Sequence, residues 1–217
     1  MERFLLTEAT LVHAVDELTG RDPALGSIVA RYGRPPLWAR EPGFPTLVHI
    51  ILEQQVSLAS ARAAFDRLLA LASLSTPASP LTPKRFLELD DMALKGAGFS
   101  RQKTRYGREL AGAILSGELN LMALDALGDQ AVHAELTKVV GIGRWTADIY
   151  LLMALRRPDA WPTGDLALAI AARHALGLAA TPSTAELAAI GEAWRPWRAV
   201  AARVLWHFYL SGGILRK

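Results

Sequence analysis

The sequence predicts an all-α protein of roughly ten helices. Ala and Leu dominate the composition, runs of β-branched residues are scarce, and apolar residues recur at helical spacing almost throughout the chain. Hydrophobic residues make up 51% of the 217 positions, which is enough apolar material for a core in one domain or in two small lobes. We therefore expect helices packed on helices.

Capping residues, glycines and prolines mark the ends of the predicted helices. In chain order, the first is a long helix capped by Thr46 with apolar positions as far as Leu69. The next helices are expected from Ser100 to about Leu115, over Val132–Val139, over Thr146–Leu155 and from Asp165 to near Gly177. The capping box of Ser183 and Glu186 opens a further helix, and the last one runs from Pro196 to about Leu210. The predicted loops are Ser75–Pro83 and Arg156–Gly164, and Arg31–Pro45 is either a linker or a β-turn segment.

The composition excludes several classes of site. The chain has no Cys, so it has no disulfide, no cysteine-ligated cluster or zinc site and no Cys nucleophile. No apolar run reaches the roughly 18–20 residues of a membrane span, and the apolar part of Met1–Leu6 is too short for a secretory signal. We expect a soluble, cytoplasmic protein with no membrane association.

The charge distribution says more than the net charge of +3. Between Lys95 and Glu109 there are five basic residues and one acid, and from Arg195 to the end there are basic residues and no acid. Basic patches on a nearly neutral chain favour a polyanionic partner. Solvated helix faces are the alternative explanation.

The most informative stretch is a glycine hairpin, in which a short helix meets a second one through Gly141-Ile142-Gly143. Glycine allows positive φ and a close approach of the backbone to another surface, while Ile142 can pack between the helices. The outward amides then lie at a helix N-terminus, which favours phosphate. This pattern matches the helix–hairpin–helix motif, which grips DNA backbone without reading bases; a plain glycine turn is the alternative. The candidate backbone contacts are Gly141, Ile142, Gly143, Arg144, Thr146 and Lys138.

Asp165 follows the hairpin after a loop stiffened by Pro162. Its first expected role is to cap the next helix, and the helix N-terminus also favours the charged carboxylate. Beside a hairpin that grips DNA, such a carboxylate can stabilise an oxocarbenium-like sugar as an N-glycosidic bond breaks, or orient the attacking water.

Together these features resemble the helix–hairpin–helix DNA glycosylase superfamily, and in particular its 3-methyladenine DNA glycosylase II branch. The matching stretches are Ile51–Ser57, Gly98–Lys103, the hairpin with Asp165, and Trp194–Ala199 continuing to Trp206, so the resemblance covers about Phe44 to Tyr209. It implies a two-lobed helical fold with the active site in the cleft between lobes. We expect residues 1–40 with 167–217 to form a terminal lobe, and residues 41–166 to form a central lobe with the hairpin at about 132–155.

The resemblance also implies roles for individual residues. Asp165 corresponds to the catalytic carboxylate. The base pocket corresponds to Trp206, Trp145 and Ile149, although the best-known relative has an aromatic residue in place of Ile149. Gln55, with Gln54 beside it, stands where that relative inserts a leucine wedge into the gap left by the flipped nucleotide. The backbone carbonyls of Thr137, Val139 and Gly141 correspond to ligands of a monovalent cation such as sodium; no other cofactor is implied.

One position indicates the type of mechanism. Relatives that cut the strand carry a nucleophilic lysine after the hairpin arginine, where this chain has Trp145. We therefore expect a monomeric, monofunctional DNA repair enzyme that flips damaged bases of the 3-methyladenine type out of double-stranded DNA and hydrolyses the N-glycosidic bond without strand cleavage. A glycosylase for oxidised or mismatched bases, or a noncatalytic DNA-binding module, is the alternative.

Overall fold

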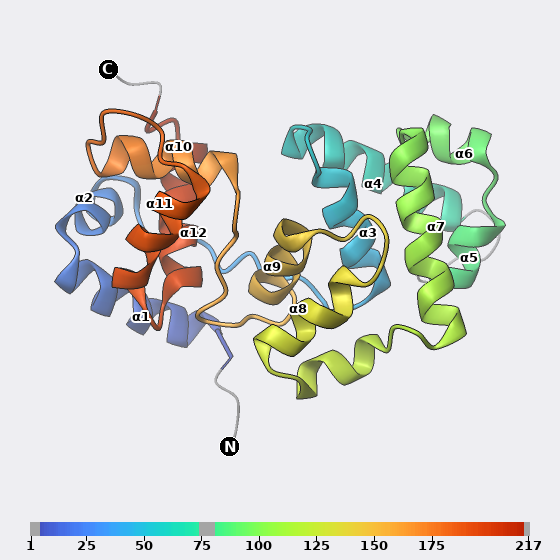
Figure 1. The fold of residues 1–217 in the computed structure, drawn as a ribbon. Coiled ribbons are helices and arrows are strands. Elements are labelled where there is room, and N and C mark those ends of the chain that lie inside the picture. The colour runs from blue at the N-terminus through green and yellow to red at the C-terminus, as the bar shows by residue number, and fades with distance from the viewer. Residues whose placement is uncertain (1–4, 74–80, 215–217) are drawn as a thin grey trace. The chain divides into compact units, whose positions relative to one another are not determined.

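The computed structural model describes residues 5–73 and 81–214, and within these ranges every regular element is a helix (Figure 1). The predicted all-α class is therefore confirmed. The chain forms two compact units, a terminal unit of Met1–Ala39 with Leu151–Lys217 and a central unit of Arg40–Tyr150. Across the described ranges, no helix is both long and apolar enough to cross a membrane.

The terminal unit is built around its last helix. Helix α12 (Arg198–Leu210) is buried along most of its length and packs against α1, α2 and α10, as Figure 1 shows. Its small residues, such as Ala201 and Ala202, allow these close approaches because helices pack ridge into groove. The elements of this unit are α1 (Glu8–Arg21), α2 (Pro23–Tyr32), α10 (Leu166–Ala175), α11 (Thr184–Gly191), the 3₁₀ helix η2 (Glu192–Trp194) and α12.

A fully buried arginine ties the terminal unit together. The guanidinium of Arg203 donates to the carbonyl oxygens of Leu37 at 2.7 Å, Leu152 at 2.8 Å and Ala199 at 2.9 Å. Buried polar groups need such partners, so these bonds join α12 to two distant segments. Residues 151–166 thus belong to the terminal unit, and the expected boundary after residue 166 is wrong.

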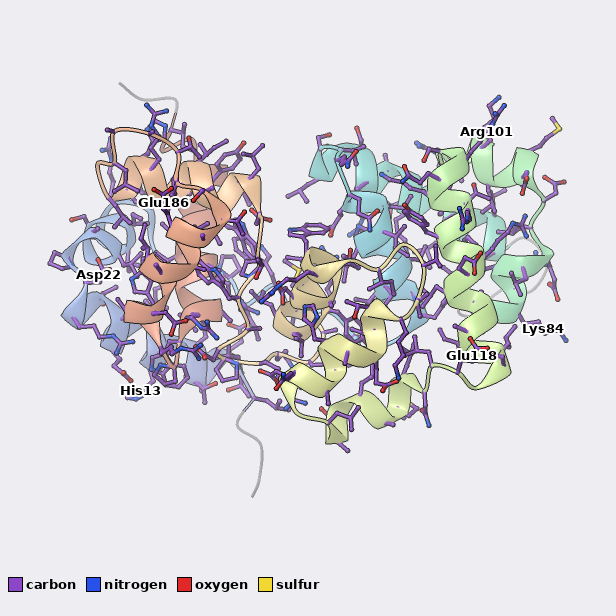
Figure 2. All side chains as sticks on the ribbon, viewed as in Figure 1. His13, Asp22, Lys84, Arg101, Glu118 and Glu186 are labelled. Carbon is purple, nitrogen blue, oxygen red and sulfur yellow. The ribbon has the colours of Figure 1, made fainter. Side chains whose placement is uncertain are left out.

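The central unit is organised by α3 (Phe44–Glu53), which packs against α4 (Leu58–Ser73) and α7 (Arg101–Ser116). Helix α7 also packs against α5 (Pro83–Glu88) and α6 (Asp91–Gly96). The unit continues through the 3₁₀ helix η1 (Leu121–Ala126) and α8 (Asp129–Thr137), and it ends at Tyr150 within α9 (Arg144–Met153). Exposed charges such as Lys84, Arg101 and Glu118 mark its outer surface (Figure 2).

Several helix ends lie where local signals place them. Ser100 caps α7, and Gly117 ends it in the left-handed conformation at φ 83°. The capping box of Ser183 and Glu186 is present at the start of α11. The last helix begins at Arg198, two residues after the expected Pro196, and Trp197 precedes it without a side-chain capping bond. The local signals did not predict helices α1, α2, α5 and α6. Pro83 opens α5, although it was expected to end a loop. Residues 74–80 of that predicted loop lie outside the described residues.

The long helix expected from Thr46 to Leu69 is wrong. The chain leaves the helix at Gln54, and Gln55 has a φ of +58°, so α3 and α4 are separate helices. Thr46 does not cap α3, since its hydroxyl donates to the carbonyl of Glu41 at 2.6 Å, and Gly43 precedes the helix instead. The periodicity is helical on both sides of Gln54 and Gln55, which is why the sequence conceals the break.

Candidate active site and hairpin groove

The hairpin joins α8 to α9 through residues 138–143, and its tip requires a glycine. Gly141 has a φ of +94°, and a Cβ at this position would lie 2.1 Å from Cγ of Tyr106. Ile142 is buried, as predicted, and its amide donates to the carbonyl of Val139 at 3.0 Å. Both its side chain and its amide are thus used within the turn, and the expected role of Ile142 as a DNA contact stays a prediction.

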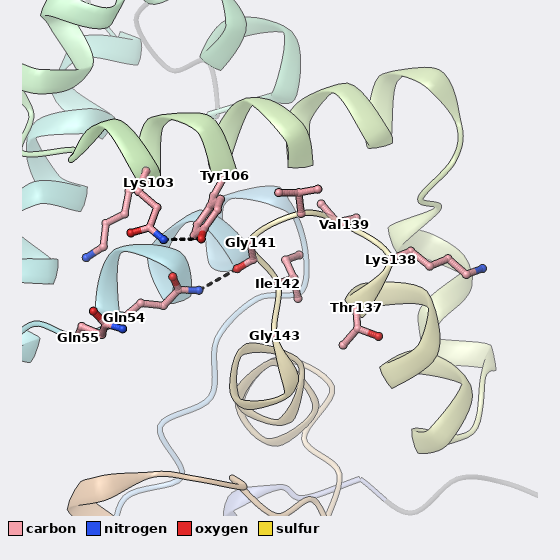
Figure 3. A pocket seen from close by; sticks show the side chains of 12 residues that line it. Gln54, Gln55, Lys103, Tyr106, Thr137, Lys138, Val139, Gly141, Ile142 and Gly143 are labelled. Carbon is pink, nitrogen blue, oxygen red and sulfur yellow. Dashed lines mark hydrogen bonds between the residues drawn. The ribbon is translucent and has the colours of Figure 1, made fainter.

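A hollow of about 510 Å³ lies beside the hairpin (Figure 3). It is lined by residues 137–143, by Gln54 and Gln55, and by Gln102, Lys103 and Tyr106 of α7. We call it the hairpin groove. Desolvation lowers the pKa of Lys103, whose ammonium donates to the carbonyl of Leu52 at 2.7 Å. The hairpin and the Lys103 ammonium thus meet at one hollow, where positive charge favours an anion such as phosphate.

The other expected backbone contacts differ in exposure. The side chains of Arg144 and Lys138 are 71% and 65% exposed, with Arg144 4.0 Å from Asp148 and Lys138 2.7 Å from Glu135. Thr146 is only 1% exposed, and its hydroxyl accepts from Gln54. The Thr146 hydroxyl is therefore engaged within the protein, and the contacts expected of Thr146, Arg144, Lys138 and Gly143 stay predictions.

The structure separates the two glutamines of the expected wedge. The side-chain amide of Gln54 donates to the carbonyl of Gly141 at 3.0 Å (Figure 3). It also donates to the hydroxyl of Thr146 at 3.0 Å. These bonds hold the Gln54 side chain against the hairpin, and its expected role as a wedge stays a prediction. Gln55 is exposed in a left-handed conformation at the edge of the groove, and its role as the wedge stays a prediction.

In the terminal unit, Asp165 caps α10 and contacts a tryptophan. Its Oδ1 accepts the amide of Leu168 at 2.8 Å, which confirms the capping role. The same oxygen accepts the indole Nε1–H of Trp206 on α12 at 3.1 Å. Two donors from different helices therefore fix the orientation of the carboxylate. The next residue, Leu166, is 70% exposed, so the capped end of α10 lies at the surface of this unit.

The remaining pocket residues lie on α9. Trp145 is half-buried in the first turn of that helix, and Ile149, one turn later, is 2% exposed. The structure thus brings Trp206 to Asp165 within the terminal unit and brings Gln54 and Gln55 to the hairpin within the central unit.

The α7 residues of the groove had no predicted role. Lys103 belonged to a basic run and to the stretch Gly98–Lys103, but no role followed from either. The signal was the spacing of Gln102, Lys103 and Tyr106 within one turn of helix, which puts a polar and aromatic set on one side of α7. The amide of Gln102 donates to the hydroxyl of Tyr106 at 2.6 Å, as Figure 3 shows.

The hairpin, the helix order and the capped Asp165 define a helical repair protein, and the comparison with known families agrees. The chain belongs to the HhH-GPD superfamily of base excision DNA repair proteins, whose model matches residues 48–196. The expected superfamily is thereby confirmed. The matched segment contains both the hairpin and Asp165.

Individual relatives are similar over most of this chain. It is 27% identical to the Schizosaccharomyces pombe 3-methyladenine DNA glycosylase solved with abasic DNA, with a TM-score of 0.82 over 89% of this chain and 95% of that one. A Bacillus halodurans DNA-3-methyladenine glycosidase is 28% identical, with a TM-score of 0.71 over 96% and 93% of the two chains. DNA-3-methyladenine glycosylase 2 of Escherichia coli is 32% identical over 193 residues, which are 85% of this chain and 64% of that enzyme.

Proposed function

We propose that this protein is a DNA-3-methyladenine glycosylase II-like hydrolase that removes alkylated bases from double-stranded DNA. The observation that carries the proposal is the Asp165 carboxylate held by Leu168 and Trp206, in a chain that also has a glycine hairpin beside an anion-favouring groove. The names of the relatives support the same substrate class. We propose that the protein acts as a monomer inside the cell.

The chemistry follows from the charge of the lesion. A purine alkylated at N3 or N7 is cationic, so it is a good leaving group and needs little protonation by the enzyme. As the N-glycosidic bond breaks, positive charge develops on the sugar, and the Asp165 carboxylate stabilises it electrostatically. The Nε1–H of Trp206 and the amide of Leu168 hold that carboxylate before the substrate arrives, so little reorganisation is needed during the reaction.

The hairpin supplies the grip on DNA. The exposed Gly143, the first turn of α9 and the side chain of Arg144 surround a surface where a backbone phosphate can accept hydrogen bonds. Gln55 lies at the edge of the same groove, where it can fill the gap left by an everted nucleotide. Flipping costs a few kcal/mol and is least costly for a damaged or weakly paired base.

Water is the proposed nucleophile at the sugar. The position after the hairpin arginine is Trp145, whose indole has no amine to form a Schiff base. Base removal then leaves an intact abasic strand.

We also propose a monovalent cation at the hairpin, held by the carbonyl oxygens of Thr137, Val139 and Gly141. These residues line one groove, and the carbonyls of Val139 and Gly141 each accept one hydrogen bond and keep a second lone pair, so they fit such an ion. The bound cation would add positive charge near a phosphate. At matched ionic strength, replacing potassium and sodium by tetramethylammonium should weaken abasic-DNA binding severalfold; unchanged affinity would reject this site.

A base-release assay on a panel of duplexes tests the function. We expect release of 3-methyladenine and 7-methylguanine, no release of 8-oxoguanine or of a mismatched base, and no covalent adduct with borohydride. Release of oxidised or mismatched bases alone would favour the alternative glycosylase class. DNA binding without release of any base would favour a noncatalytic module, and a trapped adduct would contradict the water mechanism.

A further inference from the structure

We propose that Gln54 is a positioning residue that locks the turn carrying Gln55 to the hairpin. The groove that grips a phosphate and the residue that enters the base stack then act as one body. This inference rests on the proposed function, and it concerns how flipping and backbone binding are coupled.

The tie is a single side-chain amide with two acceptors. Gln54 stands at the C-terminal cap of α3, and its Nε2 donates to the Gly141 carbonyl at 3.0 Å (Figure 3). The same Nε2 donates to the Thr146 hydroxyl at 3.0 Å. Gly141 is at the tip of the hairpin and Thr146 is in the first turn of α9. Because Thr146 is 1% exposed, water does not compete freely for this bond.

A second tie holds the same turn from α7. The ammonium of Lys103 donates to the carbonyl of Leu52 at 2.7 Å. This carbonyl lies in the last turn of α3, where carbonyls lack intrahelical partners. The turn is thus fastened both to α7 and to the hairpin.

The turn has a conformation that needs such support. Gln55 adopts a φ of +58°, which is uncommon for a residue with a side chain and persists only where the surroundings enforce it. The two ties act on the residues just before it. We infer that they set the direction in which Gln55 projects at the edge of the groove.

The consequence is a coupling between two events during flipping. A nucleotide stays everted only if its backbone is held and its vacated place is filled. Gln54 joins the two groups across 87 residues of sequence, so they keep one separation and orientation. Without the hydrogen bonds of Gln54, the hairpin and Gln55 must be ordered separately when the DNA binds. The entropic cost of ordering them then slows the flipping step. The cost should be greatest when the base must leave a base pair.

Gln54→Met tests the tie, since it keeps the length of the side chain and removes both donors. The same alkylated base is placed either in a normal pair or opposite an abasic-site analogue, and single-turnover release is measured. We expect about tenfold slower release from the paired duplex and less than about twofold change from the unpaired one. The fluorescence of 2-aminopurine beside the lesion should report less flipping. Gln130→Met, a glutamine of α8 outside the groove, is the matched control and should change neither rate.

Thr146→Val is a second variant that removes one of the two acceptors. It should give a smaller loss with the same preference for the paired duplex. Combining it with Gln54→Met should add little, because Gln54→Met already removes the bond to Thr146. Equal losses on the two substrates, or unchanged release from the paired duplex, would overturn the coupling. If the unmodified protein releases no alkylated base, the proposed function itself fails, and this inference fails with it.

Discussion

Asp165→Asn should abolish base release and leave the binding of abasic DNA largely intact. The asparagine oxygen can still accept from the Leu168 amide and the Trp206 indole, so the cap of α10 is preserved. What is lost is the negative charge that, in the proposed mechanism, stabilises the developing positive sugar. We expect release of 3-methyladenine to fall by on the order of a thousandfold or more, measured by single-turnover kinetics.

Binding measurements separate this effect from misfolding. Affinity for an abasic duplex, measured by fluorescence anisotropy, should stay within about twofold of the unmodified protein, and the melting temperature should change little because Asn and Asp cap helices about equally well. Full activity of Asp165→Asn would reject the catalytic role.

Trp206→Phe tests the support of the carboxylate, because it keeps an aromatic ring and removes the donor to Asp165. It should slow release about tenfold.

Gly141→Ala should weaken DNA binding by at least about tenfold. The residue has a φ of +94°, and the added methyl carbon would lie 2.1 Å from Cγ of Tyr106. The hairpin must therefore shift away from α7, which also disturbs the carbonyl that accepts from Gln54. Strain of about 1–3 kcal/mol, together with the overlap, should lower the melting temperature by several degrees.

Gly112→Ala is the matched control for this substitution. Gly112 is in the same helix as Tyr106, its φ is helical, and an added Cβ would meet nothing within 4 Å. Since Ala favours the helix by about 1 kcal/mol over Gly, the control should be slightly more stable and should bind abasic DNA normally. Wild-type affinity of Gly141→Ala would show that the shape of the hairpin tip does not govern DNA binding.

Local chemistry explains which helix ends the sequence predicts. Ser100, Asp165 and Ser183 each cap a helix by accepting an amide three residues further along the chain, so the pattern is complete within four positions. Gly117 and Gly141 likewise stand where the backbone requires a left-handed conformation. Such features do not depend on the rest of the fold. The capping carboxylate of Asp165 and the hairpin were visible for this reason, and their combination pointed to the superfamily.

The features that the sequence concealed depend on distant partners. The break between α3 and α4 lies in a continuous helical pattern, and the residues there bond to Gly141 and to Thr146 far along the chain. The boundary of the terminal unit also differs from the one predicted after residue 166, because Arg203 of α12 binds the carbonyl of Leu152. No short-range rule links these positions.

The sequence by itself therefore determined the helical class, the glycine-dependent hairpin and the capped Asp165, since each arises from interactions within a few residues. Only the tertiary structure decided that Gln54 braces the hairpin and that Gln55 lies exposed beside it, and it supplied the hydrogen bond from Trp206 to Asp165 across 41 residues. These outcomes depend on how helices pack, because packing determines which side chains meet across long stretches of chain.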